Sequence, residues 1–113
     1  MSLLQDIQTA LTPLGIPMET GVFQEAAPEK YIVVVPLSDT FDLFSDNQPG
    51  VTVQEARISL YTQGSYTAEK AAIVRALLGA GLTITAQQYI GYEADTGYHH
   101  YSIDAAHYYE EGE

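Results

Sequence analysis

Two hydrophobic periods follow one another between Val51 and Gly81. In the first half of this stretch apolar and polar residues alternate, which places Ala56, Ile58 and Leu60 on one face. A period of two is typical of a half-buried β-strand, because successive side chains leave opposite faces of the pleat. After a polar turn the apolar spacing changes to about 3.6 residues, the period of an amphipathic helix. The stretch therefore predicts a strand, a turn and a helix.

The helix of this unit is expected to complete a core that the strand begins. It ends at Gly79 and Gly81, because glycine readily adopts the left-handed conformation of a helix C-terminal cap. The side chains that we expect to face the core are Ala71, Val74, Leu77 and Leu78.

A second helix is predicted from Ser2 to Leu14, where leucine and isoleucine recur at positions i, i+3, i+4 and i+7. Ser2 followed by Gln5 has the pattern of a capping box at its start. Residues 19–23 then predict a short strand, and 24–30 a connection, because they contain Ala-Ala-Pro and charged residues.

The run YIVVVPL at 31–37 predicts a central strand, because it is rich in β-branched residues and apolar on both faces. Pro36 either ends its ladder or lies at a sheet edge. Residues 38–50 predict a long loop. Its large apolar side chains either fold back into the core or dock a partner, and both interpretations stay open for Phe41, Leu43 and Phe44.

The last part of the chain predicts a hairpin, with strands at 82–92 and 98–109 around a turn at 94–97. Leu82, Ile84 and Ala86 are expected on one face of the first strand, and the acidic end at 110–113 is expected to fray. In the second strand one face holds Tyr101, Ile103 and Ala105.

The predicted order is therefore α-β-β-loop-β-α-β-β. It indicates a single α+β domain over residues 1–113, with a mainly antiparallel sheet of four to five strands and two helices packed on it. Val51 and Val53 do not fit this core, because they alternate onto the face opposite Ile58 and Leu60. Either a bulge inverts the register there, or another subunit covers that end of the strand.

Composition bounds the function more than it identifies it. The 113 residues are the size of one domain and include no cysteine, which excludes disulfides and cysteine-based metal sites. No apolar run approaches the ~20 residues that span a bilayer. The net charge of −11 disfavours binding to the phosphates of nucleic acid and to anionic membranes.

Catalytic and metal chemistry find little support in the spacing of residues. His99 and His107 share a face of one strand but lie about 26 Å apart, at ~3.3 Å per residue, so they cannot bind one ion. His100, Ser102 and Asp104 stand in an order that suggests a triad. Neighbours at i, i+2 are about 6.6 Å apart, which is too far for a nucleophile and its base. We expect no enzyme activity and no cofactor.

Nine tyrosines and no tryptophan give the chain an unusual aromatic content. Tyrosine is enriched at protein interfaces, since one end is apolar and the other forms hydrogen bonds. Cross-strand pairing that only stabilises the hairpin is an equal alternative. The predicted interface residues are Phe41, Leu43, Phe44, Val51, Val53, Tyr61, Tyr89, Tyr92, Tyr108 and Tyr109.

Most of the chain resembles the small head-to-tail joining and tail terminator proteins of long-tailed bacteriophages and prophages. The resemblance lies in the YIVVV strand and in the SDNQPG approach to QEARISLYTQGSYTAEKAAIVRALLGAG. It extends to the ending GYEADTGYHHYSIDAAHYYEEGE.

The resemblance implies a homo-oligomeric ring, usually hexameric, at the tail-head junction of a virion made in the bacterial cytoplasm. Such a ring ends tail-tube growth, contacts other neck and tail proteins, and needs no cofactor, reaction or membrane. DNA would pass through it without specific binding, and the acidic charge fits a lumen without groups that bind phosphates. Two alternatives stay open: a minor tail or other neck protein at a different station, and a tyrosine-rich binding module for carbohydrate or a host protein.

Overall fold

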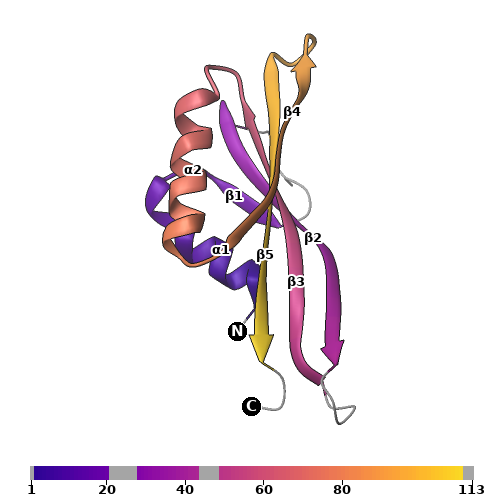
Figure 1. Cartoon of the computed structure of the whole chain (residues 1–113). Helices are drawn as coiled ribbons and strands as arrows, with labels where there is room; N and C mark the ends of the chain where they lie inside the picture. Colours follow the sequence, from indigo (N-terminus) through magenta and orange to yellow (C-terminus); the bar gives the residue numbers. More distant parts are fainter. Residues whose placement is uncertain (1, 21–27, 44–48, 111–113) are drawn as a thin grey trace.

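A five-stranded sheet organises the chain, with the strand order β1-β2-β3-β5-β4 (Figure 1). The computed structural model describes residues 2–20, 28–43 and 49–110. β1 runs parallel to β2, and every other neighbouring pair is antiparallel. The strands are β1 (Met18–Thr20), β2 (Lys30–Leu43), β3 (Pro49–Thr62), β4 (Thr83–Glu93) and β5 (Tyr98–Glu110).

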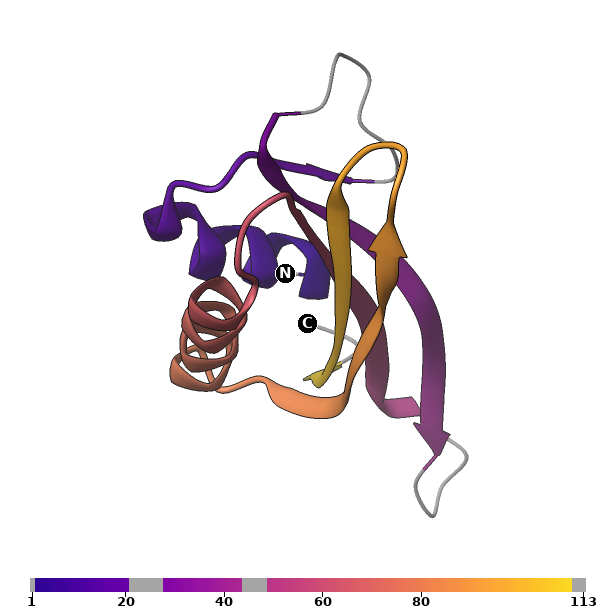
Figure 2. The same ribbon diagram turned by 90° about the horizontal axis from the view of Figure 1, so that it is seen from above.

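Both α-helices, α1 (Leu3–Leu11) and α2 (Thr67–Gly79), lie on the same side of the sheet (Figure 2). We call this side the helix face and the opposite side the open face. The predicted α+β class, the two packed helices and the element order are confirmed. The strand of the central unit is also the middle strand of the sheet.

The N-terminal helix begins where its cap predicts, because the Ser2 hydroxyl accepts a hydrogen bond from the Gln5 backbone N–H at 3.2 Å. It is shorter than expected, since Thr12–Leu14 form a 3-10 turn, η1. Gly15, at φ 73°, then ends the turn in the left-handed region.

The core lies between the helix face and the two helices. Ile58 on β3 stands between Val34 on β2 and Ile103 on β5, and it is fully buried. The predicted rows on β3 and β5 are thus confirmed as core. Five further fully buried side chains of this cluster come from the helices: Leu3, Ile7, Leu11, Ile73 and Leu77.

The core face of α2 differs from the prediction at one residue. Leu78 is 54% exposed, whereas Ile73 is fully buried. Ile73 and Leu77 are four residues apart and so share one side of the helix, but Leu78 is turned away from that side by about 100°. Gly81 has φ 84° directly after the helix, as the predicted C-terminal cap requires.

The long loop predicted at 38–50 is wrong over most of its length. β2 continues to Leu43 and β3 already begins at Pro49, so the two strands form one long hairpin. Pairing with β3 holds Asp39 opposite Gln54 and Asp42 opposite Val51, so the polar part of this segment is strand. The residues between the two strands, including Phe44, lie outside the described residues.

Pro36 lies at an edge, which is one of the two positions expected for it. β1 pairs with β2 only from Ile32 to Val34, and β2 has a register shift between Pro36 and Ser38. The missing N–H of proline therefore falls where β2 has already lost its partner on that side among the described residues.

β4 is more irregular than its sequence predicts. Its register against β5 shifts between Ile84 and Ala86 and again between Tyr89 and Gly91. The first shift moves Ala86 to the opposite face from Ile84, so their expected common face is wrong. A bulge adds one residue to one strand and thereby inverts the alternation that follows it.

The position of Val53 follows from the pairing of β3 with β5, which has no register shift from Val51 to Thr62. A bulge of β3 against β5 is therefore not the explanation for the mismatch noted in the sequence. Val53 lies on the open face, where it is half-buried beside Tyr108 of β5.

Replacing Ile58 with Ala removes a fully buried side chain from the centre of the core. We expect this change to lower the free energy of unfolding by about 2–5 kcal/mol. Leu78→Ala, at a position that is 54% exposed, provides the matched control, with an expected change within ~0.5 kcal/mol. Urea unfolding followed by circular dichroism measures both. Equal losses in the two variants would contradict the assigned core.

Candidate interface surfaces

One end of the sheet carries aromatic rings on its helix face. Tyr66, just before α2, stacks against Tyr89 of β4 and Tyr101 of β5, with ring centroids 5.2 and 5.5 Å apart. His99 lies beside them, and the Tyr89 hydroxyl is 2.9 Å from its Nδ1. Tyr92 completes this helix-face cluster, with its ring 4.8 Å from that of His99. The hairpin thus has the cross-strand pairing that its sequence suggested.

The outer part of this cluster remains exposed. Tyr92 is 56% exposed, Tyr89 41%, and the neighbouring Ile90 48%. All three lie on β4, which pairs on one side only within the described chain. Large apolar side chains gathered at a sheet edge are typical of an interaction surface.

The open face carries a second aromatic group at the same end of the sheet. Tyr31, Tyr61 and His100 are direct cross-strand neighbours on β2, β3 and β5. Their rings stack in a row, with centroids 4.8 Å apart for Tyr31–Tyr61 and 4.3 Å for Tyr61–His100. Tyr98 packs edge-on against this row and donates a hydrogen bond to the Pro28 carbonyl. Tyr61, a predicted interface residue, thus has intramolecular partners.

Burial changes the acid-base behaviour of this row. It raises the pKa of Tyr61 and lowers the pKa of His100 below its usual 6.5, in both cases because the charged form is poorly solvated. The Nε2 atom of His100 is buried and has no hydrogen-bond partner among the described residues.

The centre of the open face is polar and internally satisfied. Ser59 and Ser102 are buried as a cross-strand pair between the aromatic row and an ion pair. In that pair the Arg57 guanidinium donates two hydrogen bonds to Asp104, at 2.8 and 3.1 Å. Asp104 is thus bound by Arg57, and His100 stacks on Tyr61, so two of the three candidate triad residues have other partners.

At the opposite end of the sheet, the open face has a shallow hollow of about 460 Å³. Val53 and Tyr108 line it together with Thr83 and Ala106. Tyr108 is 58% exposed. Two predicted interface residues from β3 and β5 therefore lie at one surface feature.

Tyr109 faces the other way, into the molecule. Its hydroxyl donates a hydrogen bond of 2.5 Å to the Asp6 carboxylate of α1. Burial, followed by this carboxylate, raises the pKa of the phenol. The structure therefore gives Tyr109 the role of joining β5 to α1.

The remaining predicted interface residues have a described backbone at most. Phe41 and Leu43 lie in β2, and Val51 lies in β3. Their side chains, and all of Phe44, fall outside the described residues. Sequence reasoning missed three exposed residues, Ile90, Val35 and Leu37. Their exposure follows from the order of the strands in the sheet, which cannot be read from local sequence patterns.

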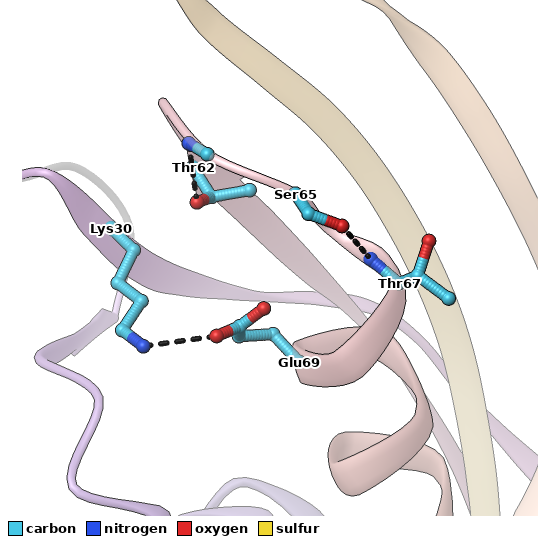
Figure 3. A network of polar contacts seen from close by, with 6 residues as sticks. Lys30, Thr62, Ser65, Thr67 and Glu69 are labelled. Atoms are coloured by element: carbon cyan, nitrogen blue, oxygen red, sulfur yellow. Dashed lines mark hydrogen bonds and ion pairs between the residues drawn. The ribbon is translucent and has the colours of Figure 1, made fainter.

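Most of the basic side chains are engaged within the subunit. Lys30 binds Glu69 at 2.9 Å, next to a turn in which the Thr62 and Ser65 hydroxyls accept backbone hydrogen bonds, the latter from Thr67 (Figure 3). The hydrogen bond from Lys30 lowers the pKa of Glu69. Most of the acidic excess is left without such a partner, so the surface is strongly negative.

No cluster of three or more potential metal ligands occurs within residues 2–20, 28–43 and 49–110. Over the same residues, neither helix is long and apolar enough to cross a membrane. The chain matches no model of a known protein family, and no curated protein matches it.

The burial of His100 predicts a pH dependence of stability. The unfolded chain takes up a proton at this residue near its usual pKa of 6.5, whereas the folded chain resists it. Below that pH the unfolded state binds more protons, so the free energy of unfolding falls as the pH decreases. His100→Phe keeps a ring that can stack on Tyr61 but cannot titrate.

We expect the wild-type chain to lose more stability than His100→Phe between about pH 7.5 and pH 5.5. Urea unfolding at both values measures this difference, and carboxylate titration is common to the two proteins. An equal loss in both proteins would show that the His100 ring is not buried as described.

Proposed function

We propose that this protein is a structural subunit of a bacteriophage or prophage virion, a tail terminator or head-tail joining protein that assembles into a ring. The resemblance in the central strand-turn-helix and in the closing hairpin names this class. The observation that supports assembly is the distribution of exposed apolar side chains. They gather on two different strands, β2 and β4, at opposite sides of one sheet.

A closed ring requires such an arrangement. In a cyclic assembly each subunit presents two unlike surfaces, one to each neighbour, and closure occurs when the rotation between copies completes a circle. Val35 and Leu37 on β2 are 37% and 42% exposed, and β4 presents Ile90 and Tyr92. A two-fold dimer would need only one self-complementary patch.

The charge of the subunit suits a passage for DNA. Acidic residues exposed on the described surface include Glu19, Asp39 and Glu93. A channel lined by such residues offers no cations that could release counterions from the phosphate backbone, so DNA would pass without binding. Other neck and tail proteins would contact the two rims of the ring.

Deletion of the gene from its phage or prophage tests the proposal in the native setting. Loss of a terminator should yield tail tubes of irregular, excessive length that carry no heads, because nothing ends tube growth. Electron microscopy of induced cultures measures tube length, and expression of the chain in trans should restore joined virions.

We expect a different result if the chain is a minor tail protein or a neck protein at another position in the virion. Tubes of normal length would then persist after deletion. If virions formed normally without the chain, the structural role itself would be wrong. A monomeric chain that bound an oligosaccharide on a glycan array would then favour a tyrosine-rich binding module, with Tyr89 and Tyr92 as its exposed rings.

A further inference from the structure

The two long sides of the sheet have unpaired backbone. Among the described strands β4 pairs with β5 alone, so its outer edge, Thr83–Glu93, has no partner within that part of the chain. On the other side β1 covers β2 only as far as Val34, and no described strand pairs with that side of β2 from Val35 onward. Open edges can accept a further strand, because their N–H and C=O groups have no partner in the sheet.

Exposed apolar side chains concentrate on these two edges. The described chain has seven exposed large apolar residues, and five of them lie on β2 or β4. They are Val35 and Leu37 on one side, and Tyr89, Ile90 and Tyr92 on the other.

The same two stretches are free of charge. Residues 35–38, where the open part of β2 begins, and residues 82–92 contain no Asp, Glu, Lys or Arg, although the chain has a net charge of −11. Two identical acidic chains repel each other wherever their carboxylates approach. These two uncharged stretches are where two copies can meet without opposing like charges, so charge favours a second copy of this chain as the occupant.

We propose that β4 of one copy adds to the β1–β2 edge of the next copy, so that the sheet continues from subunit to subunit. This inference rests on the proposed ring and identifies the contact that builds it. Three antiparallel pairings separate β2 from β4, so the two strands run in opposite directions. Rotation about an axis along the strands preserves their direction, and the joint between copies is therefore antiparallel.

The register across the sheet shows which residues of different strands lie at the same level along the strand direction. Ala86 of β4 lies in one row with Asp104, Arg57 and Val35. Val35 is the first residue of β2 that β1 no longer covers. Further along, the row that contains Tyr89 ends at Met18 of β1. In the ring, Ala86 on β4 of one copy would therefore lie opposite Val35 on β2 of the next copy.

A mixing experiment tests this contact. Ile90→Asp places a charge on the β4 edge and Leu37→Asp places one on the β2 edge, both at exposed sites where folding tolerates it. Leu78→Asp, on α2 and 54% exposed, is the matched control. An unpaired charge buried in the joint is strongly unfavourable, so each edge variant should weaken self-association by about 100-fold or more.

Each edge variant alone should be monomeric by mass photometry at concentrations where the wild-type chain and Leu78→Asp form rings. An equal mixture of Ile90→Asp and Leu37→Asp should form dimers and nothing larger, because the pair retains one intact joint. If both variants formed rings like the wild type, the edge contact would be wrong while the ring proposal stood.

Cross-linking tests the contact even if the free chain associates weakly. The chain has no cysteine, so Ala86→Cys and Val35→Cys can be combined in one protein and treated with a short bis-maleimide. We expect a ladder of oligomers from the double variant and no ladder from either single variant. Absence of the ladder would overturn the edge contact, whereas failure of the ring proposal appears separately, as normal tails after gene deletion.

Discussion

The unbroken pairing of β3 with β5 determines where every other element lies. From Val51 to Thr62 the register never shifts, so the face of each side chain on both strands follows by simple alternation. One face receives Ile58 and Ile103 and is closed by the two helices. The other face receives Arg57, Asp104 and the aromatic row, and no helix in the described chain covers it.

This ladder also explains why the exposed apolar groups lie at the sides of the sheet. β3 and β5 pair with a strand on each side and have no register shift against each other, whereas the shifts fall between β2 and β3, after Pro36 and after Asp42, and twice in β4. Bulges and prolines are devices that limit uncontrolled pairing of open edges. Here they stand beside uncharged, apolar residues, a combination that suits a specific neighbour of fixed register.

The sequence predicted those features that depend on local periodicity. The alternation at Ile58 and the 3.6-residue spacing at Leu77 identified their elements and much of the core. Periodicity could not place Leu78, because which side of a helix is covered depends on its packing partners. Residues 38–43 were predicted as loop, because only the partner strand shows that their backbone is paired.

The candidate surfaces were predictable in composition but not in position. Tyr89 and Tyr92 were expected at an interface because tyrosine is common there, and they lie on the open β4 edge. Tyr61 and Tyr109 carry the same side chain but are held by Tyr31 and Asp6 within the subunit. The sequence alone does not distinguish the exposed tyrosines from those with partners inside the subunit; the arrangement of the strands does.

Hydrogen exchange of the β4 backbone tests the central claim most directly, because β4 is the strand that a neighbouring copy would cover. Mass spectrometry can compare peptides that span residues 83–93 in the free subunit and in the assembled ring. We expect the outward-pointing amides of β4 to exchange rapidly in the free subunit and to become protected on assembly, together with those of β2 beyond Val35. Unchanged exchange in β4, with new protection confined to the helices, would contradict the edge-to-edge joint.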